Sequence, residues 1–362
     1  MFARLSSAPG MALVPAALLF VLGCATAPMP ESTYELEPLV LEAQGQKVVE
    51  VDARERFQVA ADAYARGRHG EALRLFEDVA RLFPESKFAP HALYNAGLAL
   101  VQLQRFDEAL SVLADAREQL ADDEDRFDAL CQIGTCYEGL GRWQDVRGVM
   151  RQVLTRKSLN VRDRVEARIR LGLAFHRMGD WAQAERELDL ALDEHRKNPG
   201  VPSLKSNPWV ARAQFVIGEM YRELFRSIQF RLPVESMERD LSDKSSFFLK
   251  AQTAYLQAIR LSTKPWSVGA GFRLGELYEA MVEDMMKAEI PADMDETDRG
   301  IYFDELKKYV KPMVERAVDI YQRALQMNDR LGGTEEWSKA SEAGLDRMQR
   351  MLESELRERS GE

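Results

Sequence analysis

The chain has 362 residues and a formal net charge of −10 at pH 7. An acidic chain binds polyanions poorly, which argues against nucleic acid as a partner. The same charge argues against attachment to a membrane through a polybasic surface.

The first residues are typical of an export signal. Arg4 supplies a positive charge, and residues 11–22 form an apolar run that is too short to span a bilayer as a mature helix. The run ends at Leu22-Gly23-Cys24, which resembles the lipobox of bacterial lipoproteins. The resemblance implies that residues 1–23 are a lipoprotein signal peptide and that Cys24 carries the lipid. The alternative is an ordinary secretory signal with an incidental cysteine.

The residue after the cysteine bears on localisation. Ala25 stands where an acidic residue would retain a lipoprotein in the inner membrane of some diderm bacteria. The resemblance therefore implies an outer-membrane lipoprotein that faces the periplasm, although this sorting rule varies among bacteria. Residues 24–51 lack helical periodicity and contain Pro28, Pro30 and Pro38, so we predict a flexible tether there.

Beyond Asp52 a pattern of small residues recurs. Ala60, Gly97, Gly134 and Gly172 follow one another at intervals of about 37 residues, and each follows an apolar residue. Small residues allow two short antiparallel helices to approach closely, and a glycine after the first helix favours the left-handed cap that reverses the chain. Because no single hairpin buries its apolar face, we predict a stack of hairpins.

This pattern resembles the tetratricopeptide repeat over roughly residues 53–330. Residues 83–97 (FPESKFAPHALYNAG) resemble the repeat boundary of envelope lipoproteins and periplasmic proteins of the barrel-assembly and Tol-Pal-associated families. The resemblance implies an all-α, right-handed superhelical solenoid.

The predicted domain organisation follows the repeats. Residues 52–204 hold repeats one to four, residues 205–333 hold two extended repeats, and residues 334–362 hold a capping helix and tail. The extended repeats contain inserts of helical periodicity, which predict long helices over 234–262 and 297–331.

In the repeat family, the first helix of each hairpin lines a concave groove. The alternative is that residues at these positions pack against the neighbouring hairpin. The glycine register places the following candidates for a partner-binding groove on these helices: Phe57, Tyr64, Tyr94, Leu98, Ile169, Leu173, His176, Phe215, Arg222 and Phe272.

No catalytic pattern is present in the sequence. The four histidines are scattered and none lies in an HExxH arrangement. The glycine-rich run 269–275 lies inside a predicted helix, which favours close packing over nucleotide binding. Cys131 and Cys136 are best interpreted as core thiols. We therefore expect no enzyme activity, no cofactor and no metal site.

Together these features predict a lipid-anchored scaffold that binds envelope proteins through the groove or the projecting helices. The combination resembles barrel-assembly lipoproteins, pilotins and, most nearly, the repeat lipoprotein of the myxobacterial gliding machinery. Gliding motility or another trans-envelope complex is the leading expectation, with outer-membrane protein assembly or a pilotin role as the alternative. A cell-wall enzyme regulator or a periplasmic ligand carrier is the alternative of another class.

Overall fold

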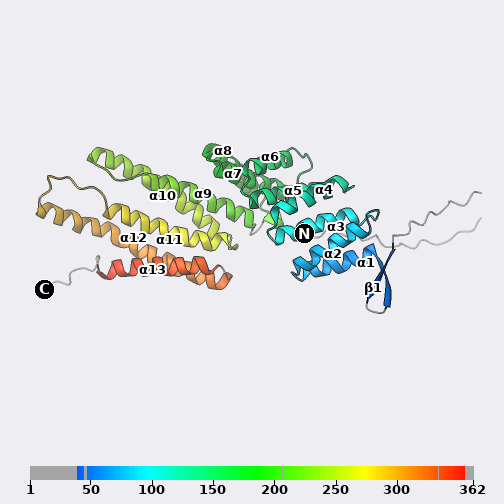
Figure 1. Cartoon of the computed structure of the whole chain (residues 1–362). Helices are drawn as coiled ribbons and strands as arrows, with labels where there is room; N and C mark the ends of the chain where they lie inside the picture. Colours follow the sequence, from blue (N-terminus) through cyan, green and yellow to red (C-terminus); the bar gives the residue numbers. More distant parts are fainter. Residues whose placement is uncertain (1–38, 45–46, 205–206, 333, 355–362) are drawn as a thin grey trace, which may run out of the picture. The chain divides into compact units, whose positions relative to one another are not determined.

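The computed structural model describes residues 39–44, 47–204, 207–332 and 334–354 (Figure 1). The chain divides into two compact units, Met1–Arg142 and Trp143–Glu362. This division falls inside the predicted third repeat. The sequence analysis instead placed a boundary near residue 204, between repeats one to four and the two extended repeats. Each unit is described separately.

The first unit stacks helices in chain order. Each helix packs against the next, and α1, α3 and α5 also contact one another in turn. The chain reverses after α1 and α3 at Gly67 and Gln104, whose φ angles are 74° and 59°, so Gln104 adopts the left-handed conformation that glycine provides elsewhere. The helices are α1 (Ala53–Ala65), α2 (His69–Leu82), α3 (Ala89–Gln102), α4 (Phe106–Gln119) and α5 (Asp123–Gly139).

A β-hairpin precedes α1, where the sequence analysis predicted only a flexible tether. Strands β1 (Leu39–Gln44) and β2 (Lys47–Asp52) pair antiparallel, with Leu39 opposite Asp52. The valines of these strands explain the difference, because β-branched residues favour extended backbone. The remainder of the predicted tether, together with Cys24, lies outside the described residues.

The second unit is itself a stack of antiparallel helices, and several of them are longer than those of the first unit. Consecutive helices pack together, and α7, α9, α11 and α13 also contact one another in turn. The predicted long helices are confirmed as α10 and α12. The helices are α6 (Trp143–Leu154), α7 (Val161–Arg177), α8 (Trp181–Lys197), α9 (Pro208–Ser227), α10 (Val234–Arg260), α11 (Trp266–Met286), α12 (Glu296–Leu331) and α13 (Glu335–Ser354), with a short 3₁₀ turn at Pro202–Leu204.

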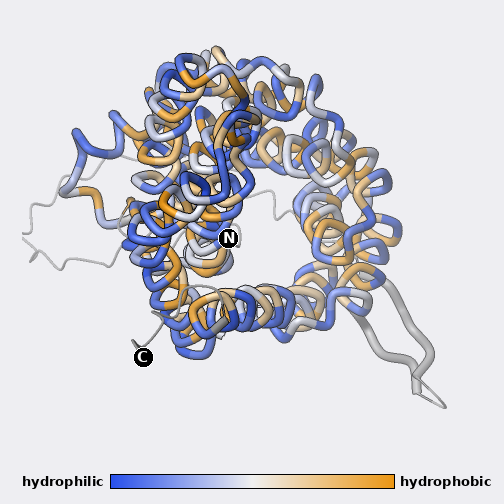
Figure 2. The backbone as a smooth tube through the Cα atoms, turned by 90° about the vertical axis from the view of Figure 1, so that its left-hand side faces the viewer, coloured by the Kyte–Doolittle hydropathy of each residue, from blue (hydrophilic) through white to orange (hydrophobic). Residues whose placement is uncertain are grey.

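The all-helical repeat fold is therefore confirmed, with the β-hairpin as an addition at its start. Hydrophobic and hydrophilic residues alternate along the helices of both units, as expected for helices that bury one face (Figure 2). Within the described residues, no helix has both the length and the apolar composition needed to cross a membrane.

Small residues hold the paired helices close together. A Cβ atom added to Gly172 of α7 would lie 2.8 Å from Cγ of Leu188 and 3.2 Å from the carbonyl oxygen of Ala184, both on α8. The glycine is thus required by the close approach of the two helices, as the repeat register predicted.

A fully buried lysine joins the long helices of the second unit. Nζ of Lys244 on α10 donates hydrogen bonds to the carbonyl oxygens of Phe225 (2.8 Å) and Ile228 (2.7 Å) at the end of α9. The same atom lies 2.8 Å from Oδ2 of Asp284 on α11. The buried charge is therefore fully surrounded by acceptors, and it satisfies carbonyls that the helix end leaves without an intrahelical partner.

Candidate binding groove in the second unit

The first helices of successive hairpins in the second unit line a groove of about 350 Å³. Three partly exposed tryptophans, Trp143, Trp266 and Trp337, come to it from α6, α11 and α13. We call this site the tryptophan groove. Its other principal lining residues are Leu173, His176, Arg177, Arg212, Phe215, Glu219, Glu223 and Arg273.

Arginines stack on the aromatic rings of the groove. The guanidinium of Arg212 lies 5.1 Å from the ring centre of Trp266 and 5.2 Å from that of Trp209. Arg273 lies 5.5 Å from Trp337, and Arg177 lies 5.7 Å from Trp143. Contacts of this kind restrict the long arginine side chains and place their positive charges over the aromatic rings.

A carboxylate network forms one wall of the groove. Glu219 accepts hydrogen bonds from Nη2 of Arg222 (2.9 Å) and from the hydroxyl of Tyr255 (2.5 Å), and Nε of Arg273 lies 3.4 Å from it. Burial, together with this carboxylate, raises the pKa of Tyr255 well above its ordinary value. Glu219 therefore holds Arg222 and Arg273 in place and offsets part of their positive charge.

Three of the predicted groove residues in this unit, Leu173, His176 and Phe215, line the tryptophan groove. Of these, Leu173 is 4% exposed and Phe215 is 9% exposed, so they form its floor. Burial lowers the pKa of His176, whose ring packs edge-on against Trp181.

The other predicted residues of this unit lie elsewhere. Ile169 is fully buried, so a partner cannot reach it in this structure. Arg222 is held in the carboxylate network, and Phe272 packs between Tyr321 and Trp337. The side chains of these three residues pack against their neighbours, which is the alternative stated in the sequence analysis.

In the first unit the predicted groove residues also pack between helices. Phe57 contacts the rings of Phe76 and Phe88, with centroids 5.4 and 5.6 Å away. Tyr94 and Leu98 are 7% and 8% exposed, and burial raises the pKa of Tyr94. Tyr64 is partly exposed, lies edge-on to His69, and has a pKa that burial raises.

The tryptophans were missed because the groove candidates were placed at set positions inside the first helix of each hairpin, and none of these positions is a tryptophan. Every tryptophan in the chain, of which there are five, lies within the first three residues of a helix. Three of the five line this groove, so a position at a helix start does not by itself identify the site.

A second apolar feature lies where the long helices project. Residues of α10, α11 and α12 line a cleft of about 220 Å³, including Met237, Met285 and Leu306. Val234 and Leu241 at its edge are 49% and 45% exposed. This cleft belongs to the projecting helices that the sequence analysis proposed as a second surface.

Nothing in the described part of the chain brings together three or more His, Cys, Asp or Glu side chains that could hold a metal ion. Cys136 is buried and Cys131 is partly buried.

Comparison with known proteins agrees with the repeat pattern. The sequence profile of the tetratricopeptide repeat matches residues 63–133. No curated protein matches the chain.

Solved structures with similar folds are distant in sequence. A tetratricopeptide repeat protein from Parabacteroides merdae is 16% identical, with 82% of this chain and 98% of that chain covered and a TM-score of 0.39. The C-terminal part of a TPR repeat-containing protein from Cytophaga hutchinsonii is 11% identical, with 84% and 96% covered and a TM-score of 0.44. A piece of MamA from Desulfovibrio magneticus is 18% identical, with 57% and 96% covered and a TM-score of 0.40. The profile match shows tetratricopeptide repeat sequence in residues 63–133, and the hairpin stack agrees with it.

Proposed function

We propose that this protein is a lipid-anchored adaptor of a bacterial envelope machine, and that it holds a partner protein in the tryptophan groove. Tetratricopeptide repeats generally mediate protein–protein interactions through surfaces formed by successive repeats. The observation that carries the proposal is the gathering of three partly exposed tryptophans and their stacked arginines in one groove.

The chemistry of the groove favours a peptide segment. Tryptophan and arginine are enriched among the residues that dominate interface energies, especially where a buried floor excludes water. Leu173 and Phe215 provide such a floor. The guanidinium of Arg177, which lines the groove, supplies hydrogen-bond donors for carbonyl or carboxylate oxygens of the partner. We therefore expect a segment that combines an apolar anchor with acidic or carbonyl groups.

Replacing Trp266 with alanine tests this role. Partners are first identified by crosslinking in intact envelopes and then purified for titration against the full chain. We expect Trp266→Ala to fold and to weaken binding by about 2 kcal/mol or more, roughly 30-fold, as for other interface anchors. Trp181→Ala is the control, because Trp181 also starts a helix but does not line the groove. A folded Trp266→Ala variant that binds as tightly as wild type would contradict the proposal.

His176 provides a contrasting prediction at the same site. Its ring is partly buried against Trp181, and its pKa is lowered. A neutral ring at the groove edge offers little electrostatic attraction, so we expect His176→Ala to bind the same partner almost as tightly as wild type.

The lipid anchor is proposed from the sequence around Cys24 alone. Replacing Cys24 with alanine should prevent lipidation, leave the precursor uncleaved by the lipoprotein peptidase and release the protein from membrane fractions, because acyl chains supply the attachment. Membrane fractionation and mass spectrometry of the N-terminus check this result. Unchanged maturation and fractionation would refute the anchor while leaving the groove proposal intact.

Outer-membrane localisation and participation in gliding motility form part of this proposal. The support is the resemblance of the extended last repeats to the myxobacterial gliding lipoprotein. Barrel assembly and a pilotin role are the alternatives, and the identity of the crosslinked partner distinguishes them.

A further inference from the structure

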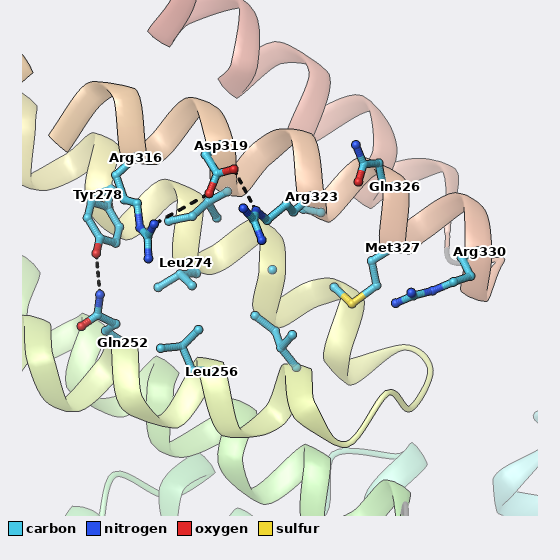
Figure 3. Close-up of a pocket in the computed structure, with 14 residues that line it drawn as sticks. Gln252, Leu256, Leu274, Tyr278, Arg316, Asp319, Arg323, Gln326, Met327 and Arg330 are labelled. Atoms are coloured by element: carbon cyan, nitrogen blue, oxygen red, sulfur yellow. Dashed lines mark hydrogen bonds and ion pairs between the residues drawn. The ribbon is translucent and has the colours of Figure 1, made fainter. Parts of the chain in front are cut away.

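A second groove lies on the opposite helices of the last two repeats. It runs between α10 and α12 and has α11 as its floor, with a volume of about 470 Å³ (Figure 3). It shares no lining residue with the tryptophan groove. We call it the arginine groove, after Arg316, Arg323 and Arg330 of α12.

The interior of the arginine groove is apolar and has helical periodicity. On α12, Ile320, Ala324 and Met327 face the groove at spacings of four and three residues, which place them on one face of that helix. Leu256 on α10 and Leu274 on α11 complete the apolar surface, and Leu256 is 39% exposed. Ile320, Ala324, Met327 and Leu274 are at most 9% exposed, so they form the floor of the groove, with Leu256 at its edge.

The charged residues lie along one flank at regular spacing. Arg316, Arg323 and Arg330 are seven residues apart, so they lie on nearly the same side of α12 at intervals of about 10.5 Å. Arg316 and Arg323 lie 3.9 and 2.8 Å from Asp319, the single acidic residue of the lining, and their side chains are 62% and 74% exposed (Figure 3). This flank therefore carries more positive than negative charge, although the chain as a whole is acidic.

The equivalent groove one repeat earlier shows that this arrangement is not a general property of the stack. Between α8 and α10, a groove of about 350 Å³ is lined by Asp189, Arg196 and Lys250 as its charged residues. These come from two different helices, and they include no heptad-spaced series of positive charges, because Asp189 and Arg196, seven residues apart, have opposite charges.

From this geometry we propose that the arginine groove docks an amphipathic helix of a partner protein, whose apolar edge is flanked by Glu or Asp at heptad spacing. A docked helix repeats its positions about every 10.5 Å per heptad, which matches the arginines. In a β-strand, side chains on the same face are about 6.6–7 Å apart, so they would not stay aligned with the arginines. Carboxylates near the arginines would form charge-assisted hydrogen bonds, which supply specificity and faster association more than affinity.

The test uses the full chain and a synthetic three-heptad peptide with leucines on one edge and a glutamate flanking each heptad. We expect saturable binding by fluorescence anisotropy. The double variant Arg323→Glu/Arg330→Glu should weaken that binding at least ~10-fold, because two attractive pairs become repulsive. The matching lysine peptide should bind this variant better than it binds wild type.

Two controls separate this site from other effects. Arg196→Glu reverses a charge in the neighbouring groove and should leave the peptide affinity unchanged. Trp266→Ala should also leave it unchanged, so failure of this inference is distinguishable from failure of the tryptophan groove. Because Arg323 and Arg330 are exposed, the double variant should melt like wild type. Absence of saturable binding, or equal binding by the charge-reversed variant, would overturn the inference.

Discussion

Lys244 shows how one buried side chain can hold the extended part of the second unit together. Lys244→Met keeps much of the apolar stem but leaves Asp284 and two carbonyl oxygens without their donor. We expect a loss of about 3 kcal/mol in the free energy of unfolding, because hydrogen bonds to charged groups and buried ion pairs are costly to break. Urea denaturation followed by circular dichroism measures this loss.

Lys287→Met is the matched control for that measurement. Lys287 also pairs with a carboxylate, Glu283, but its side chain is 73% exposed. Its removal should change stability by no more than about 0.5 kcal/mol. Equal effects of the two variants would show that the burial of Lys244 does not matter.

Substitutions of Gly172 and Gly148 provide a second test and its matched control. Gly172→Leu should destabilise the protein by about 1–3 kcal/mol or more, since even its Cβ would press on Leu188. Gly148 lies in α6 with nothing within 4 Å of an added Cβ. Gly148→Ala should therefore stabilise the protein by about 0.5–1 kcal/mol, by lowering the entropy of the unfolded chain. Thermal melts showing no difference between these variants would contradict the repeat register.

At the scale of elements, α13 closes the stack. It contributes Met348, which is 2% exposed, and Arg347, which donates to the buried carboxylate of Glu279. A chain truncated after Leu331 would uncover Tyr321 and Phe272 of the same apolar cluster. We expect this chain to melt at a lower temperature and to bind a hydrophobic dye, while a chain truncated after Ser354 behaves like wild type. Terminal repeats generally need such a polar-faced cap.

The helices of this fold were largely predictable because their ends have local causes. The range 234–262 was predicted and α10 spans Val234–Arg260, since Pro233 fixes its start. The range 297–331 was predicted and α12 spans Glu296–Leu331, ending at Gly332 with a φ of 63°. The β-hairpin was not predicted because Pro28, Pro30 and Pro38, which precede it, are typical of irregular structure, and its strands are short.

The site was less predictable than the fold. The register placed candidates on α7, α9 and α11, but it could not distinguish Ile169, which is fully buried, from His176, which lines the groove. Both lie on α7. Whether a first-helix residue is covered depends on the size of side chains on the next hairpin, which is a long-range property.

At the scale of the whole molecule, tyrosines make the protein sensitive to alkali. Burial raises the pKa of Tyr94, Tyr221, Tyr255 and Tyr321 above the ordinary value of 10.0. The unfolded chain then loses these protons at a lower pH than the folded chain. Stability is therefore fully present below pH 10 and falls as the pH rises above it.

Tyr321→Phe tests that prediction. The hydroxyl of Tyr321 donates a hydrogen bond to the carboxylate of Glu279, so ionisation of the tyrosine would place two negative charges together. The variant should lose a hydrogen bond at neutral pH and show a shallower decline of stability in alkali. Urea midpoints measured across the pH range, with tyrosinate absorbance as the titration signal, check both effects. A wild-type midpoint that stays constant well above pH 10 would contradict the prediction.

All five tryptophans lie in the second unit, and this distribution has a spectroscopic consequence. No tryptophan precedes Trp143, so all of the indole emission of the chain originates in the second unit. Far-ultraviolet dichroism, by contrast, samples the helices of both units. The two signals therefore monitor different portions of one polypeptide, and any separation between their denaturation curves would measure how independently the portions melt. Three of the five fluorophores also line the tryptophan groove, so its occupancy can be followed without an added label.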